Sequence, residues 1–180
     1  MAPQTEKKIV LIVRTTRLDE LVARYNTEAQ ARFYIEHLGA DFSDYQQEDA
    51  RYKAAMREAR ERLQEIGRVQ VVDRSFVPNF IFGAEDTVVV LGQDGLVANT
   101  LKYLDHQPVV GVNPDPTRWE GVLLPFHVRD LGKLLPEVFR GGRAMAEVTL
   151  ARVELSDGQV LHAVNDLFIG ARSHISARYC

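Results

Sequence analysis

A carboxylate stands between two glycines at the end of an apolar run. Residues 88–91 read Val-Val-Val-Leu, and Gly92-Gln93-Asp94-Gly95 follow. Glycines after a strand let the backbone approach a ligand closely, and a helix that begins there directs free N–H groups at the same place. A phosphate would suit that place. A carboxylate beside a phosphate can bind Mg²⁺ or take a proton from an attacking hydroxyl, and phosphoryl transfer uses both roles.

The same residues also have a simpler interpretation. Asp94-Gly95 can cap a helix after a tight turn. The G-x-D-G pattern is short, and it matches neither the Walker pattern nor the Rossmann G-x-G-x-x-G. On these four residues alone the cap is favoured, and the ligand site remains the alternative.

Three further polar residues follow predicted strands. Arg14 and Arg17 come after the apolar run 9–13, and Asn113 comes after the run 108–112. Because the carboxyl ends of parallel strands share one edge of a sheet, we expect all three at the edge that carries Asp94. The arginines could hold phosphates or a carboxylate, or could simply begin a helix at the surface. Asn113 could touch a ligand, although Asn-Pro-Asp-Pro is also a turn sequence.

These candidates depend on an alternation of strands and helices. Apolar runs predict strands at 9–13, 69–72, 87–91 and 108–112, and helical periodicity predicts helices within 18–38 and at 48–66, 96–104 and 126–139. This order predicts an α/β fold with a Rossmann-like parallel sheet, covered by helices on both faces. We assign residues 1–141 to this nucleotide-binding domain.

The pattern changes after residues 141–142, which are both glycine. Residues 145–155 and 160–169 are strand-like, the Asp157-Gly158 step between them favours a hairpin, and 174–179 resemble a further strand. So few strands make a marginal sheet by themselves. We therefore expect residues 142–180 to be the N-terminal part of a longer β-rich domain, or to pair with another chain in a homo-oligomer.

Composition narrows the class of protein. The chain has 22 Lys and Arg against 25 Asp and Glu, a formal charge of −3, which argues against a nucleic-acid-binding surface. Its single cysteine, Cys180, allows no internal disulfide and no thiolate metal cluster. No segment has the apolar length needed to span a bilayer. We expect a cytoplasmic protein with no membrane partner.

Several weak motifs in one order resemble the NAD kinase family, closest to the mitochondrial-type enzymes and their bacterial relatives. The segments are VRTTRLDELVARY at the start, LGQDGLVANTLKYL after the third strand, GVNPDP followed by EGVL, and AVNDLFIG near the end. They are similar to the family's RTTR-like start, its G-G-D-G-T loop, its GVNxDPxxxEGxL segment and its ALNExFIG segment. The resemblance covers nearly the whole chain.

The resemblance implies transfer of the γ-phosphoryl group of ATP to the 2′-hydroxyl of the adenosine ribose of NAD, giving NADP. It implies that Asp94 is the catalytic base and that Gly92 and Gly95 shape the nucleotide loop. Asn165 and Asp166 would contact the dinucleotide. Mg²⁺ would arrive with ATP, because no His, Cys and Asp set in the chain has metal-ligand spacing. Dimers or tetramers are usual in the family.

The chain departs from the family pattern at three positions. Gln93 replaces the second glycine of the loop, Leu96 replaces its threonine, and Asp166 replaces a glutamate. The family's later Gly/Ser/Thr-rich segment would follow Tyr179. Two other hypotheses therefore stay open: a lipid or sugar-phosphate kinase with a similar loop, and a non-catalytic relative that binds NAD(P) or ATP as a sensor or partner subunit.

Overall fold

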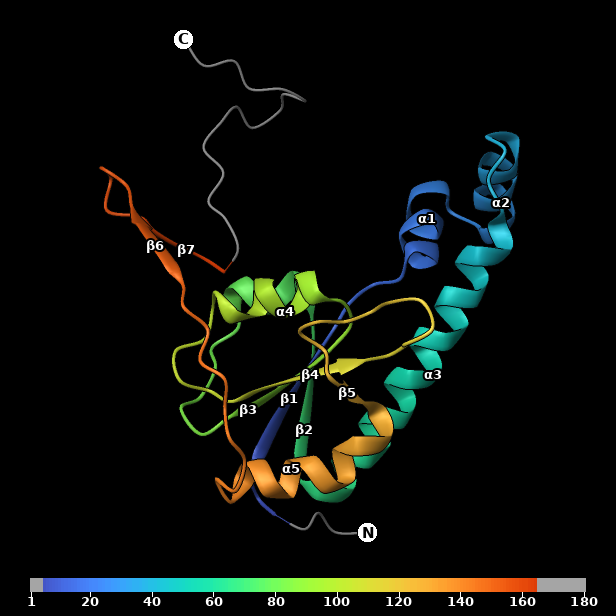
Figure 1. The fold of residues 1–180 in the computed structure, drawn as a ribbon. Coiled ribbons are helices and arrows are strands. Elements are labelled where there is room, and N and C mark those ends of the chain that lie inside the picture. Colours follow the sequence, from blue (N-terminus) through green and yellow to red (C-terminus); the bar gives the residue numbers. More distant parts are fainter. Residues whose placement is uncertain (1–4, 165–180) are drawn as a thin grey trace.

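The fold is an α/β fold built on a five-stranded parallel sheet with strand order β2-β1-β3-β4-β5 (Figure 1). The structure is a computed structural model, and it describes residues 5–164. The strands are β1 (Lys8–Val13), β2 (Arg68–Asp73), β3 (Thr87–Leu91), β4 (Val109–Asn113) and β5 (Phe126–His127). All four neighbouring pairs run parallel, as the alternation of strands and helices predicted.

The two central strands are apolar along their length because both faces of the sheet are covered. All five residues of β3 are buried, and Ile9 to Ile12 of β1 have no exposed surface. Strands buried on both faces form continuous β-branched and leucine runs, in contrast to alternating patterns. This is why the sequence located these strands to within a residue of their observed bounds.

Helices form a layer on each face of the sheet. The helices α3 (Phe42–Ile66) and α5 (Leu131–Phe139) pack on one face. Helix α4 (Asp94–Leu101) and the 3₁₀ turn η1 (Arg74–Asn79) cover the other. A second 3₁₀ turn, η2 (Val128–Asp130), leads directly into α5. Within residues 5–164, no helix is both long enough and apolar enough to cross a membrane.

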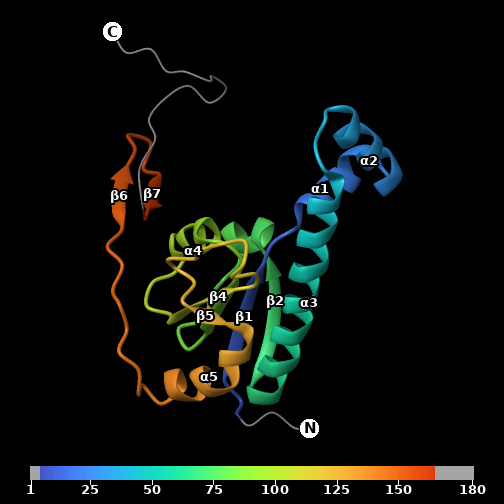
Figure 2. The ribbon, with the colours of Figure 1, turned by 45° about the vertical axis from the view of Figure 1, so that its right-hand side comes forward.

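Two short helices extend the α3 side beyond the sheet. The helices α1 (Arg17–Tyr25) and α2 (Glu28–His37) lie at the upper end of α3 (Figure 2), where Leu18, Ala31 and Phe42 form a small core. Helix α3 begins six residues before the predicted residue 48, because the Asp41 side chain accepts a hydrogen bond from the Ser43 N–H and caps it there. The added turns carry Asp44, whose role is described below.

The structure corrects the predicted helix at 126–139. Residues 126 and 127 form β5, which pairs with the last two residues of β4, and the α-helix begins only at Leu131. The open edge of β4 provides backbone hydrogen bonds for a strand, and a local helical pattern cannot anticipate that partner. The predicted helix at 96–104 is also shifted, because α4 begins at Asp94 and ends at Leu101.

The last described elements of the chain form a β-hairpin. Strands β6 (Ala151–Glu154) and β7 (Val160–Ala163) pair antiparallel through a turn in which Gly158 has φ +87°. The predicted hairpin is confirmed, and β6 is shorter than the strand expected at 145–155, while residues 165–169 of the second expected strand lie outside the described residues. It stands apart from the five-stranded sheet, at the end of a long segment that follows α5 (Figure 2). The further strand expected at 174–179 lies outside the described residues.

Candidate functional site at the carboxyl edge of the sheet

The strand order creates a switch point between β1 and β3. After β1 the chain adds β2 on one side, and it later adds β3 on the other. At such a point the connections leave in opposite directions, and ligands of doubly wound sheets bind in the crevice outside the carboxyl ends of the strands. Arg14 follows β1, and Gly92 to Asp94 follow β3. The two loops that the sequence singled out therefore flank the switch point.

The expected sharing of one edge is confirmed by the strand register. Ile12 of β1 lies opposite Val90 of β3, and Leu91 lies opposite Val112 of β4. Arg14 and Gly92, which follow their strands, and Asn113, which ends β4, consequently lie at the same edge.

Tyr52 ties the ends of β1 and β3 together. Its hydroxyl accepts a hydrogen bond from the Arg14 N–H at 2.8 Å and donates to the Leu91 carbonyl at 3.0 Å. Burial raises the pKa of the Tyr52 phenol to about 12, so the hydroxyl keeps its proton near neutrality. The helical periodicity of residues 48–66 agrees with burial of the Tyr52 ring, but no sequence pattern indicates the contacts of its hydroxyl.

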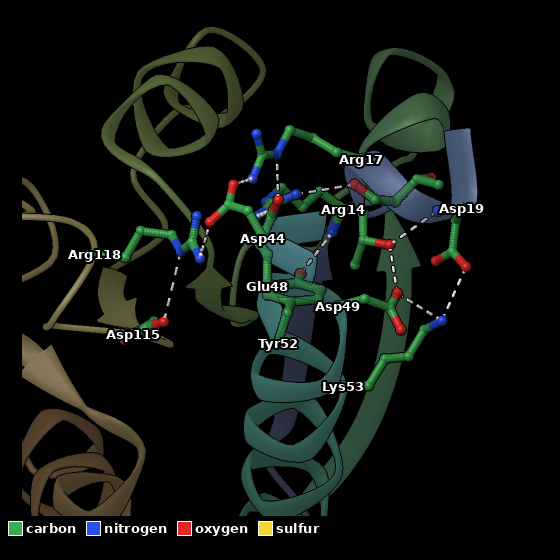
Figure 3. Close-up of polar contacts among 12 residues, drawn as sticks. Arg14, Arg17, Asp19, Asp44, Glu48, Asp49, Tyr52, Lys53, Asp115 and Arg118 are labelled. Atoms are coloured by element: carbon green, nitrogen blue, oxygen red, sulfur yellow. Dashed lines mark hydrogen bonds and ion pairs between the residues drawn. The ribbon is translucent and has the colours of Figure 1, made fainter. Parts of the chain in front are cut away.

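Arg14 and Arg17 bind carboxylates of α3 (Figure 3). The Arg14 guanidinium donates to Glu48 at 2.6 Å, and Arg17 donates through Nε to the other Glu48 oxygen. The Arg14 side chain is only 9% exposed and that of Glu48 only 4%. Two buried opposite charges compensate each other's desolvation. Of the roles open at the sequence level, these arginines hold a carboxylate, and it belongs to the protein.

A second carboxylate extends this network toward β4. Asp44 lies between two arginines, 2.8 Å from Arg17 and 2.6 Å from Arg118 (Figure 3). The hydrogen bonds from Arg118 and Arg17 lower the pKa of the Asp44 carboxyl to about 2. Neither Asp44 nor Arg118 could be predicted as a site residue, because no local pattern shows that α3 and the segment after β4 meet.

Asp94 lies at the first position of α4 and does not cap it. The N-cap is Gln93, whose side chain makes no capping hydrogen bond. The Asp94 carboxylate instead accepts the N–H groups of Leu123 at 2.7 Å and Val122 at 3.2 Å, one on each oxygen. The cap interpretation is therefore wrong. The carboxylate is oriented by backbone donors from the connection between β4 and β5.

Glycine occupies positions 92 and 95 of this loop for two different physical reasons. Neither Gly92 nor Gly95 adopts a positive φ, so no left-handed backbone requires glycine at either position. A Cβ on Gly92 would lie 2.8 Å from the buried Leu96 side chain, whereas a Cβ on Gly95 would meet open space. Gly92 is therefore needed for packing against Leu96, and Gly95 leaves the start of α4 uncovered. Gln93 has an ordinary extended backbone.

Asn113 is buried within its own turn. Its side-chain amide donates to the Trp119 carbonyl at 2.9 Å, and its side-chain oxygen accepts the Asp115 N–H at 3.0 Å. Both polar groups therefore have protein partners, as in the turn interpretation of Asn-Pro-Asp-Pro. The predicted dinucleotide contacts Asn165 and Asp166 lie outside the described residues.

A large cavity of about 870 Å³ lies away from the switch point, along the outer edge of β4. It is lined by α4, the start of β4, the end of α5 and the segment after Gly141, and it includes Val122 and Leu123. Its lining contains none of Arg14, Arg17, Gly92 and Asp94. We place the candidate site at the switch point because doubly wound sheets bind their ligands there and because the two backbone donors leave Asp94 further acceptor capacity, while the cavity is an open groove beneath an extended segment.

The fold and the edge define a doubly wound α/β domain with strand order 2-1-3-4-5, a class that binds ligands at its switch point. No protein-family model matches the chain, and a search of curated proteins finds no matching relative.

Proposed function

We propose that this protein is an ATP-dependent NAD kinase that forms NADP. The observation that carries the proposal is the position of Asp94, a half-buried carboxylate after β3, beside the switch point. A carboxylate has roughly four acceptor positions, and the backbone N–H groups of Val122 and Leu123 occupy two of them. Acceptor capacity is therefore left for a substrate hydroxyl. The order of the family-like segments in the sequence supports the same reaction.

In the proposed reaction Asp94 takes the proton of the 2′-hydroxyl of the adenosine ribose. That oxygen forms a bond to the γ-phosphorus of ATP, the bond from this phosphorus to the β–γ bridging oxygen breaks, and ADP leaves. Mg²⁺ accompanies the phosphates and neutralises their charge. Gly95, with open space where a side chain would lie, leaves room for a phosphate at the start of α4.

One observation favours a second candidate, a module that binds nucleotide without turnover. Arg14 and Arg17 are engaged by Glu48, and Arg17 is also engaged by Asp44. These carboxylates compensate the charges of both arginines, so the arginines attract a polyphosphate less strongly than unpaired guanidinium groups would. A protein that binds NAD through other residues and lacks a phosphate clamp would show affinity without catalysis.

The test is NADP formation from NAD and Mg-ATP, measured on the 180-residue chain and on the protein encoded by the full gene. General-base catalysis contributes about 10²- to 10⁴-fold, so Asp94→Asn should lower kcat by that factor. Asp105→Asn is a matched control, because Asp105 is an exposed carboxylate in the loop after α4. It should leave the rate unchanged.

One result would contradict the kinase, and another would contradict only the role of Asp94. If the wild-type proteins bind NAD by calorimetry and form no NADP, the binding module is correct. If Asp94→Asn keeps the wild-type kcat, then Asp94 is not the base. The same assay with lipid or sugar substrates in place of NAD tests the related kinases.

A further inference from the structure

The connection between β4 and β5, residues 114–125, holds the carboxylate of Asp94. Its two donors, the N–H groups of Val122 and Leu123, bind different oxygens of that carboxylate. Two hydrogen bonds to two oxygens fix both the direction of the side chain and the rotation of the carboxylate plane. An aspartate acting as a base depends on such orientation, because small displacements of a catalytic group cost rate. The inference below rests on the proposed function.

The Asn113 side chain holds the first half of this connection in a closed turn. Through one side chain it binds the Asp115 N–H and the Trp119 carbonyl, so residues 113–119 fold back on themselves. Asn113 is 4% exposed. A buried amide with both groups satisfied is a rigid connector, because breaking either hydrogen bond would leave a buried polar group without a partner.

Gly121 joins this turn to the two donors. It has φ +71°, and a Cβ at this position would lie 2.7 Å from the side-chain nitrogen of Asn113. The Leu124 N–H binds the Gly121 carbonyl at 3.0 Å, which closes a turn over residues 121–124. Only glycine satisfies both conditions at this position, namely the left-handed backbone and the contact with Asn113.

The connection is also fastened to α3 on its outer side. Arg118 binds Asp44 at 2.6 Å, and Arg51 binds Asp115 at 3.0 Å. The donors of Val122 and Leu123 therefore belong to a loop that is anchored to α3, closed by Asn113 and shaped by Gly121.

We propose that Asn113 and Gly121 are positioning residues for Asp94, acting through the N–H groups of Val122 and Leu123. Asn113 then serves the reaction without touching the nucleotide. It fixes the turn that presents the two donors, and the donors fix the carboxylate.

The first readout is amide hydrogen exchange of Val122 and Leu123 by NMR, which needs no substrate. Losing a hydrogen bond of ordinary net strength corresponds to roughly 2- to 12-fold faster exchange. Asp94→Ala should produce this acceleration directly. Asn113→Ala and Gly121→Ala should produce it indirectly. Gly39→Ala is the matched control, because Gly39 has φ +78° with no atom within 4 Å of an added Cβ, so it introduces the same backbone strain far from Asp94.

The second readout is steady-state kinetics of NADP formation. Asn113→Ala should lower kcat while the KM for NAD stays near its wild-type value, because orientation of the base changes and nucleotide contacts do not. Where Asn113→Ala does not fold, Asn113→Ser, which puts a small hydroxyl group in place of the carboxamide, takes its place.

The proposal is overturned if the folded Asn113 and Gly121 variants leave exchange at Val122 and Leu123 at the wild-type rate. It is also overturned if wild type and Asp94→Ala exchange equally fast at these residues, since the contact is then absent. If no NADP forms in any protein, the proposed function fails, and the exchange rates still decide whether Asn113 and Gly121 position Asp94.

Discussion

The two loops at the switch point use their charges in opposite ways. After β1, Arg14 and Arg17 are bound by the side chains of Glu48 and Asp44, which come from a helix. After β3, and among residues 5–164, Asp94 is bound by the backbone N–H groups of Val122 and Leu123 alone. The β1 loop is held by compensating charges, while the β3 loop presents a charge that no cation neutralises in the described contacts.

This difference in binding partners suggests a structural role for the β1 loop and a chemical role for the β3 loop. A buried ion pair loses much of its stabilisation if a ligand displaces one partner, because the other charge remains desolvated. A carboxylate held by neutral amides keeps its charge and part of its acceptor capacity. The β1 loop is therefore suited to fixing the edge of the sheet, and the β3 loop to acting on a ligand.

The largest expected effect tests the structural side of this comparison. Glu48→Ala leaves the buried Arg14 guanidinium without its partner, and breaking a buried pair in this way costs about 3–5 kcal/mol of unfolding free energy. Urea unfolding measures this loss. Glu58→Ala on the same helix is the control, because the exposed Glu58–Arg62 pair contributes no more than about 0.5 kcal/mol. Equal losses for the two variants would show that the β1 loop does not depend on Glu48.

A smaller effect is expected where the two loops are joined. Tyr52→Phe keeps the buried ring and removes the hydroxyl that binds Arg14 N–H and the Leu91 carbonyl. Leaving buried backbone groups without a partner costs about 1–3 kcal/mol, measured by the same urea titration. Tyr103→Phe, at an exposed position, should change the unfolding free energy little. A stable Tyr52→Phe protein would indicate that the two loops are joined by the sheet alone.

The smallest expected effect is the pH dependence of the unfolding free energy that comes from the Asp44 carboxylate. The folded-state pKa of Asp44 is about 2, below its ordinary value of 3.8. Its ion pairs therefore stabilise the protein fully above about pH 4, and this stabilisation is lost as the pH falls toward 2. The side chain is 44% exposed, so solvent screening keeps the contribution below about 1 kcal/mol.

The measurement is the difference in unfolding free energy between wild type and Asp44→Asn from pH 6 to pH 2. The difference should be constant above about pH 4 and shrink below it. A difference that does not change over this range would mean that Arg17 and Arg118 do not lower the pKa of Asp44, and that the Arg118–Asp44 pair does not anchor the loop after β4 to α3.

The sequence alone was sufficient to locate strands β1 to β4, whereas neither β5 nor the strand order was predicted from it. The runs at 9–13 and 87–91 are continuously apolar because both faces of their strands are covered, and burial on both faces leaves a pattern that can be recognised locally. The order of strands and helices then implied a parallel sheet whose carboxyl ends share an edge. Arg14, Asp94 and Asn113 were assigned to that edge for this reason, and the register agrees.

Only the tertiary structure decided what each of these side chains contacts. Arg14 meets Glu48 across 34 positions of sequence, and Asp94 meets Leu123 across 29. Such pairings depend on the start of α3 and on the path of the connection after β4, and no short-range pattern encodes either. The sequence determined which charged groups reach the edge of the sheet. Packing of distant segments decided that two arginines are neutralised there and that one aspartate is not, because ion pairs and hydrogen bonds require proximity in space.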